Sequence, residues 1–171
     1  NLFVDTDDNL VLKYLDVKMP EIIIRKLKEY DLPKNIPILI GPGGFTYQKF
    51  KKIYSSNAYH SYSRFVFDAG GLKYPLSNFP DMSILTPHEG EFRMLFNIPK
   101  KIPISYSLLL KVQKLIGSKI IILKSFNTFI ITNIKIYIIE NSPSVLATAG
   151  TGDVLSGILI SLLSQGYSRL E

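Results

Sequence analysis

One stretch near the end of the chain, ATAGTGDVLSGIL from Ala147 to Leu159, combines the residue types that phosphate chemistry requires. Gly150 and Gly152 let the backbone approach a ligand closely, and the amides that open the following helix favour an anion. Asp153 follows at once. Since a carboxylate repels an anion, Asp153 needs another task, such as taking a proton from a hydroxyl while the Gly150–Thr151–Gly152 amides hold a transferring phosphoryl group.

The same residues allow a plainer interpretation. Thr151 or Asp153 could simply cap the last helix. Because G-T-G-D alone is a weak motif, the rest of the chain must decide between phosphoryl chemistry and capping.

The composition narrows the class of protein. A length of 171 residues predicts one domain, and 46% hydrophobic with 20% charged residues is typical of a globular protein with a sizeable core. The chain has no cysteine, which excludes disulfides and thiolate metal sites and favours the cytoplasm, and two histidines are too few for a histidine-built metal cluster. No apolar run reaches the ~20 residues of a membrane-spanning helix. The net charge of +6 comes from scattered lysines, so we expect neither a nucleic-acid nor a membrane partner.

Predicted strands alternate with predicted helices along the chain. The pattern predicts strands over 2–4, 36–40, 65–67, 84–85 and 119–124, and a hairpin over 128–140 that turns near Asn133. It predicts helices over 20–30, 45–56, 92–96 and 105–117, and a last helix that ends at Gln165 before Gly166. This alternation indicates a mostly parallel sheet with helices on both faces.

Glycine-containing turns follow three of these strands. They are Gly41–Gly44, Asp68–Gly71 and Thr86–Gly90. Since ligands bind at the carboxyl ends of the strands in such sheets, we expect all three turns on one rim. No repeat or linker interrupts the chain, which is consistent with a single domain over 1–171.

Several segments together resemble one enzyme family. ILTPHEGEFRML and ATAGTGDVLSGIL are similar, in order and spacing, to two signature segments of the ADP-dependent NAD(P)H-hydrate dehydratases, and LIGPGG, FDAGGL, LKSFNTFI and the MPE of Met19–Glu21 also fit that family's pattern. The likeness runs through essentially the whole chain. It implies an α/β fold of the ribokinase-like type, three αβα layers around a mostly parallel sheet.

The resemblance also implies a reaction. These enzymes repair NADH and NADPH whose nicotinamide ring has been hydrated, and they dehydrate the S-epimer at the expense of ADP, or of ATP in eukaryotic relatives, with Mg²⁺. The ring hydroxyl is phosphorylated and phosphate then leaves, assisted by the ring nitrogen's lone pair. The implied partners are NADHX or NADPHX and an adenine nucleotide. A homo-oligomer and a separately encoded N-terminal segment or epimerase stay open.

The family's functional residues carry over onto matching positions. Asp153 corresponds to the base that contacts the hydrate, and Gly152 to a nucleotide-binding glycine. His88 corresponds to a substrate-binding histidine, although a histidine at a helix start often has no such role. Gly43 or Gly44 should lie against the hydrated dinucleotide, or form an ordinary turn.

A second group of positions concerns the nucleotide. The segment that binds it corresponds to Lys124, Ser125, Phe126, Asn127 and Thr128, for which a plain strand-end turn is the alternative. Asp68 is a weaker candidate for positioning phosphate or Mg²⁺, and capping is its plainer interpretation.

The chain departs from the family's pattern in places. Ser125 and Ala149 stand where glycine is usual. The chain begins after the family's first strand–turn–helix unit and stops before its final helix, so we expect an incomplete domain that is a poor catalyst by itself. Two rival functions remain: a small-molecule kinase of the same superfamily, for hydroxymethylpyrimidine phosphate or hydroxyethylthiazole, and a non-catalytic remnant. TPHEGEF favours the dehydratase over the kinase.

Overall fold

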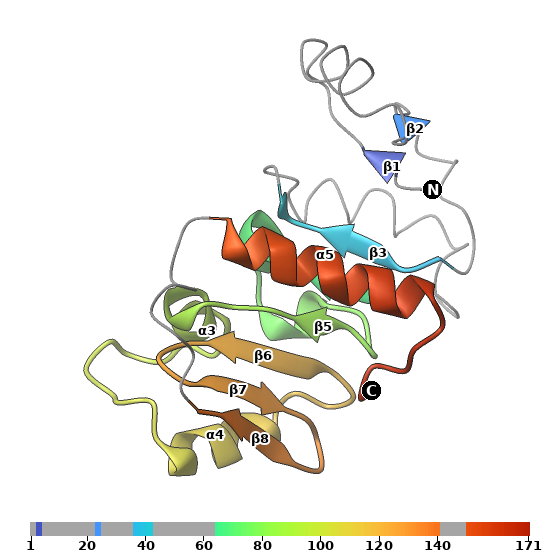
Figure 1. The fold of residues 1–171 in the computed structure, drawn as a ribbon. Helices are drawn as coiled ribbons and strands as arrows, with labels where there is room; N and C mark the ends of the chain where they lie inside the picture. The colour runs from blue at the N-terminus through green and yellow to red at the C-terminus, as the bar shows by residue number, and fades with distance from the viewer. Residues whose placement is uncertain (1–2, 5–22, 25–35, 43–63, 141–149) are drawn as a thin grey trace. The chain divides into compact units, whose positions relative to one another are not determined.

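The computed structural model describes residues 3–4, 23–24, 36–42, 64–140 and 150–171 (Figure 1). The chain divides into two compact units, Asn1–Pro33 and Lys34–Glu171. In the first unit, β1 (Phe3–Val4) pairs in parallel with β2 (Ile23–Ile24). The strand predicted at 2–4 is therefore confirmed. The helix predicted over 20–30 is wrong at β2, because β-branched isoleucine favours extended backbone and pairing with β1 outweighs the helical spacing of the apolar residues.

The second unit is built on a six-stranded sheet whose strands follow chain order, β3 to β8. The first four strands, which are parallel to one another, are β3 (Ile38–Ile40), β4 (Phe65–Phe67), β5 (Ile84–Leu85) and β6 (Ile120–Lys124). Antiparallel β7 (Thr128–Ile131) and β8 (Ile136–Ile139) complete it. The predicted strands and the hairpin are confirmed.

The described helices also match the sequence pattern. They are α3 (Glu89–Leu95), α4 (Tyr106–Gln113) and α5 (Thr151–Ser164). Gly166, directly after the C-cap of α5, has a φ of 95°, a left-handed conformation that ends a helix, as predicted. The predicted end at Gly117 is wrong for α4, which ends at Gln113 with Lys114 as its C-cap. The helix predicted over 45–56 lies outside the described residues. Within the ranges described, no helix has the length and apolar character needed to cross a membrane.

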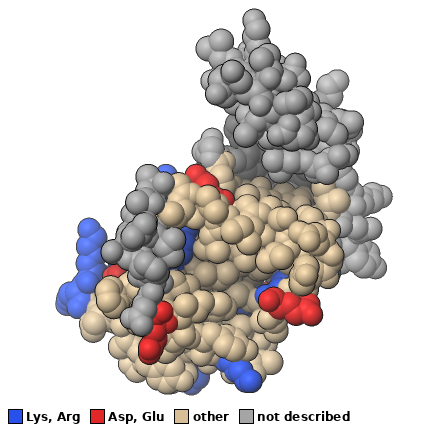
Figure 2. All heavy atoms as spheres, viewed as in Figure 1, with Lys and Arg blue, Asp and Glu red and all other residues tan. Residues whose placement is uncertain are grey.

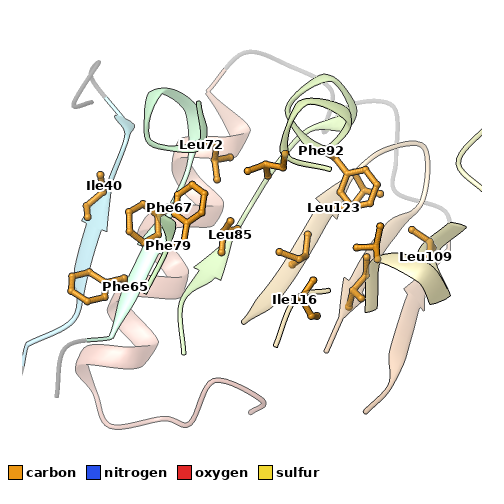
Figure 3. Packing of buried hydrophobic residues seen from close by; sticks show 14 residues of the cluster. Ile40, Phe65, Phe67, Leu72, Phe79, Leu85, Phe92, Leu109, Ile116 and Leu123 are labelled. Atoms are coloured by element: carbon orange, nitrogen blue, oxygen red, sulfur yellow. The ribbon is translucent and has the colours of Figure 1, made fainter. Parts of the chain in front are cut away.

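Alternating strand residues supply two cores, one on each face of the sheet. Phe65 and Phe67 of β4 face a cluster that includes buried side chains of α3 and α4 (Figure 3). Val66, between them, faces the other cluster, to which α5 contributes Leu163. Helices therefore cover both faces, and the three-layer αβα arrangement that the sequence predicts is confirmed.

Backbone contacts between two strand ends fix the rim of the sheet. Gly41, directly after β3, has a φ of 128°, and a Cβ built there would lie 1.6 Å from the backbone oxygen of Asp68. A Cβ on Gly71 would lie 2.6 Å from the backbone oxygen of Ile40. The turns after β3 and β4 thus interlock with no space for side chains. Together with the turn after β5 they lie at the carboxyl ends of parallel strands, so one shared rim is confirmed for their described residues.

Replacing Gly41 with alanine should destabilise the protein severely. The new methyl group collides with backbone that cannot move without separating β3 from β4, so we expect a loss of more than about 3 kcal/mol in the free energy of unfolding. Urea denaturation measures it. The control is Gly157→Ala in α5, where a Cβ meets nothing within 4 Å. That change should be neutral or stabilising by about 0.5–1 kcal/mol. Equal stability of the two variants would contradict the interlocked turns.

Candidate phosphate-binding site

The N-cap residue of α5 has no side chain that could cap the helix. Its N-cap is Gly150, which has a φ of 94° and makes no side-chain capping bond. Neither Thr151 nor Asp153 occupies the N-cap position, so the plainer interpretation of the G-T-G-D segment is wrong in that respect. The start of a helix presents amide N–H groups and the positive end of the helix dipole.

A lysine ammonium lies directly over this turn. A Cβ built on Gly152 would lie 3.1 Å from Nζ of Lys124 and 3.7 Å from Oδ2 of Asp68. Lys124 ends β6, and its side chain is 26% exposed. Lys124 and Gly152 lie far apart in the chain, and both were predicted to bind the nucleotide. The structure places them next to each other at the rim.

The carboxylate of Asp68 accepts hydrogen bonds from the groups around this turn. Its Oδ1 accepts hydrogen bonds from the Ala69 amide and from Lys124 Nζ, both at 2.9 Å. Its Oδ2 accepts one from Ser156 Oγ at 2.6 Å. Burial by itself raises the pKa of Asp68, but the hydrogen bonds from Ser156 and Lys124 and the lysine's charge together lower it below its ordinary value. Asp68 is therefore a carboxylate at neutral pH, and its predicted capping role, at η2 (Ala69–Leu72), is confirmed.

Ser156 was not identified by the sequence analysis. It is fully buried in α5, and its hydroxyl lies 3.0 Å from the carbonyl oxygen of Gly152. The only signal was a serine among the apolar residues of VLSGIL. A serine in such a helix commonly bonds the carbonyl four residues earlier, so the pattern did not indicate a carboxylate partner.

Asp153 and His88 also lie at this rim. Asp153 is exposed in the first turn of α5. A backbone bridge joins His88 to Lys124, and the Lys124 amide donates to the Pro87 carbonyl at 2.8 Å. The side chain of His88 is 61% exposed. The structure thus brings together six of the predicted site positions: His88, Lys124 and the α5 turn of Gly150, Thr151, Gly152 and Asp153.

His88 has a structural role as well. It is the N-cap of α3, and its Nδ1 accepts hydrogen bonds from the Gly90 and Glu91 amides at 3.0 and 3.3 Å. Glu91 returns a bond by accepting from the His88 amide at 2.9 Å. This capping box fixes the ring so that Nε2 is the nitrogen turned away from the helix amides.

The rest of the predicted nucleotide segment continues the rim beyond β6. Ser125 Oγ lies 3.4 Å from Oε2 of Glu89, Phe126 is 86% exposed, and Asn127 and Thr128 are half-buried. Ser125 is not among the described residues with positive φ, so its backbone does not require a glycine. Gly43, Gly44 and Ala149 lie outside the described residues.

Asp68, considered above as a candidate for positioning Mg²⁺, is not a free carboxylate. No group of three or more His, Cys, Asp or Glu residues that could hold a metal ion occurs within the described ranges. Asp68, the candidate for this role, has both oxygens engaged by Lys124, Ser156 and the Ala69 amide. Mg²⁺ takes its ligands from carboxylates together with substrate phosphates, and here the carboxylate is already committed.

The buried carboxylate predicts a pH dependence of stability. Because the pKa of Asp68 is lowered on folding, its contribution is fully present above the ordinary pKa of 3.8 and is lost as the pH falls through the lower folded value. Asp68→Asn should reduce the free energy of unfolding by about 2 kcal/mol at neutral pH. The difference from wild type should narrow below about pH 4. Urea titrations across this range measure both.

The matched control is Asp81→Asn. The pKa of Asp81 is also lowered, by its hydrogen bonds with Lys119 and Ser118, but its side chain is 80% exposed. An exposed pair contributes little, so this change should leave stability within about 1 kcal/mol of wild type. A difference between Asp68→Asn and wild type that stays constant from neutral to acid pH would contradict the buried ion pair.

Comparison with known proteins assigns the chain to a family. A model of the NAD(P)H-hydrate dehydratase family matches residues 6–171. The chain is 37% identical over 98 residues to a bifunctional NAD(P)H-hydrate repair enzyme of Helicobacter pylori, covering 52% of this chain and 20% of that protein. It is 36% identical over 90 residues to an ADP-dependent (S)-NAD(P)H-hydrate dehydratase of Neisseria meningitidis, covering 52% and 30%. The matched regions thus span a third or less of these relatives.

Solved structures show the same fold. An ADP/ATP-dependent NAD(P)H-hydrate dehydratase of Bacillus subtilis, co-crystallised with ATP and Mg²⁺, aligns with a TM-score of 0.69 at 24% identity, over 96% of this chain and 62% of that one. A ribokinase-like superfamily protein of Enterococcus faecalis aligns with a TM-score of 0.76 at 26% identity, over 95% and 60%. With its ribokinase-like αβα sheet and a family match over nearly its whole length, the chain belongs to the NAD(P)H-hydrate dehydratase family.

Proposed function

We propose that this chain carries out the ADP-dependent dehydration of S-NAD(P)H hydrate, a repair of the nicotinamide cofactor in the cytoplasm. The observation that carries the proposal is the Lys124 ammonium beside Gly152, at the start of α5 and with Asp153 in the same turn. This arrangement attracts phosphate and sets a carboxylate next to it. Membership of the family narrows the chemistry, and the relative from Neisseria is named as ADP-dependent.

The first step is phosphoryl transfer. The α5 amides and Lys124 hold the terminal phosphoryl group of ADP, while Asp153 accepts the proton of the hydroxyl on the hydrated ring. The hydroxyl oxygen forms a bond to phosphorus as the bond to the AMP oxygen breaks. Donors that are fixed before the reaction stabilise the charge that develops on the phosphoryl oxygens. An exposed Asp153 at the rim is accessible to a substrate arriving from solvent.

The second step is elimination. Phosphate departs with the electrons of the carbon–oxygen bond, helped by the lone pair of the ring nitrogen, and loss of a proton from the neighbouring carbon restores the double bond. The products are NAD(P)H, phosphate and AMP. We infer that His88 contacts the dinucleotide, because it lies beside Lys124 and is largely exposed. Phe126, also exposed, is an aromatic side chain within the proposed nucleotide segment.

Product analysis tests the proposal and separates it from its rivals. The natural full-length protein is incubated with S-NADHX and ADP, and NADH, AMP and phosphate are quantified. We expect the three products in equal amounts. A stable phosphorylated compound without NADH would indicate a kinase, and nucleotide left intact would indicate a non-catalytic remnant.

Asp153→Asn should abolish turnover without preventing nucleotide binding. Loss of a general base reduces the rate by about 10²–10⁴-fold. The ADP dissociation constant, measured by calorimetry, should stay close to that of wild type because Asp153 contacts the hydroxyl rather than the nucleotide. Asp81→Asn, at an exposed position near Lys119, is the control that removes one carboxylate elsewhere. Turnover of S-NADHX near the wild-type rate would exclude Asp153 as the base.

A further inference from the structure

We propose that Asp68 and Ser156 are positioning residues: they hold the Lys124 ammonium against the first turn of α5 before the nucleotide arrives. The inference takes from the proposed function that the anion received there is the phosphate of ADP. Neither residue touches the reacting atoms in this account. Both act through Lys124.

The contacts join three separate parts of the fold. Asp68 follows β4, Lys124 ends β6 and lies 56 residues further along the chain, and Ser156 lies 88 residues from Asp68 in α5. The Ser156 hydroxyl has one proton to donate. Its distance to Oδ2 of Asp68 is 2.6 Å, against 3.0 Å to the Gly152 carbonyl. The hydroxyl therefore donates its proton to Asp68, in the shorter, charge-assisted bond. Ser156 thus fixes the carboxylate, and the carboxylate fixes the lysine.

Electrostatics explain why Lys124 needs this support. The start of a helix carries roughly half a positive charge, so an ammonium placed there is repelled. Lys124 Nζ nevertheless lies 3.1 Å from the position that a Cβ on Gly152 would take. The buried Asp68 carboxylate offsets the repulsion. Without it, the flexible lysine would move into solvent and would have to be ordered again each time a phosphate binds, which reduces affinity.

Burial separates positioning from direct participation. Asp68 is 3% exposed and Ser156 is 0% exposed, whereas Lys124 reaches solvent. A nucleotide at the rim therefore meets the ammonium and the α5 amides rather than the two residues beneath them. Lys124 has three N–H donors, and Asp68 Oδ1 takes one of them at 2.9 Å. The others are left for phosphate oxygens.

A double-mutant cycle on ADP binding tests the inference. Calorimetry measures the ADP dissociation constant of wild type, Ser156→Ala, Lys124→Met and the double variant. Lys124→Met should weaken ADP binding by about tenfold or more, the effect of losing a hydrogen bond to a charged group. Ser156→Ala should weaken it several-fold in the wild-type background and have no further effect in the Lys124→Met background. A purely structural serine would weaken binding equally in both backgrounds, which would overturn the proposal.

Ser164→Ala is the matched control. Ser164 also lies in α5 and also bonds the carbonyl four residues earlier, Ile160, at 2.7 Å, but it is exposed and remote from Asp68. It should leave ADP affinity unchanged. If Ser156→Ala behaves like Ser164→Ala, the inference is wrong.

A second measurement needs no nucleotide. In protein with ¹³C-labelled lysine, the ε-methylene resonance of Lys124, assigned with Lys124→Met, should shift in Ser156→Ala and in Asp68→Asn but not in Ser164→Ala. An unchanged resonance in Ser156→Ala would overturn the inference. ADP binding without dehydration of S-NADHX would instead contradict the proposed function and leave the positioning result standing.

Discussion

The ion pair between Asp68 and Lys124, with Nζ and Oδ1 2.9 Å apart, is the interaction on which the rim depends. A carboxylate removed from water is strongly destabilising unless it is paired and hydrogen-bonded. Besides the local Ala69 amide, Asp68 is bonded by the ammonium of Lys124, at the end of β6, and by the hydroxyl of Ser156, in α5. The requirement therefore brings the end of β6 and the start of α5 to the end of β4.

A backbone constraint sets the position of Asp68 itself. Gly41 and Gly71 interlock the turns after β3 and β4 so closely that no Cβ fits, and the Asp68 amide donates to the Ile40 carbonyl at 2.9 Å. The backbone of Asp68 is thus fixed by the geometry of the strand ends, which limits where its carboxylate can lie. The same rim also receives the positive start of α5, which supports the phosphate site that we propose there. On the face that Figure 2 shows, the lysine and arginine side chains of the described residues lie apart from one another, so we attribute the attraction of an anion to the local placement of Lys124 and the start of α5.

The sequence predicts the parts of this account that depend on local pattern. An apolar run predicts strand β4. Glycine positions predict the turn at Asp68–Gly71 and the end of α5 at Gly166. Gly152 and Lys124 were both assigned to nucleotide binding by resemblance, but nothing in the pattern indicated that they are in contact. Ser156 was missed for the same reason: its partner lies 88 residues away, and pairing over that distance is decided by packing. The error at Ile23–Ile24 shows the converse, because strand pairing there outweighed an apparent helical spacing.

Under the proposed function, one phosphate-binding turn of a ribokinase-like fold takes part in a dehydration. In that proposal, phosphoryl transfer uses the α5 turn, Lys124 and a hydroxyl presented to Asp153, whereas the elimination that follows depends on the hydrated ring held at the same rim. The central claim is therefore that ADP binds with its terminal phosphate between Lys124 and Gly152. A crystal structure of the protein with ADP tests this most directly. The account predicts a phosphate oxygen within hydrogen-bond distance of both Lys124 Nζ and the Gly152 amide, with the Asp68–Lys124 contact retained. A nucleotide whose phosphates lie away from α5, or that leaves Lys124 paired with Asp68 alone, would contradict it.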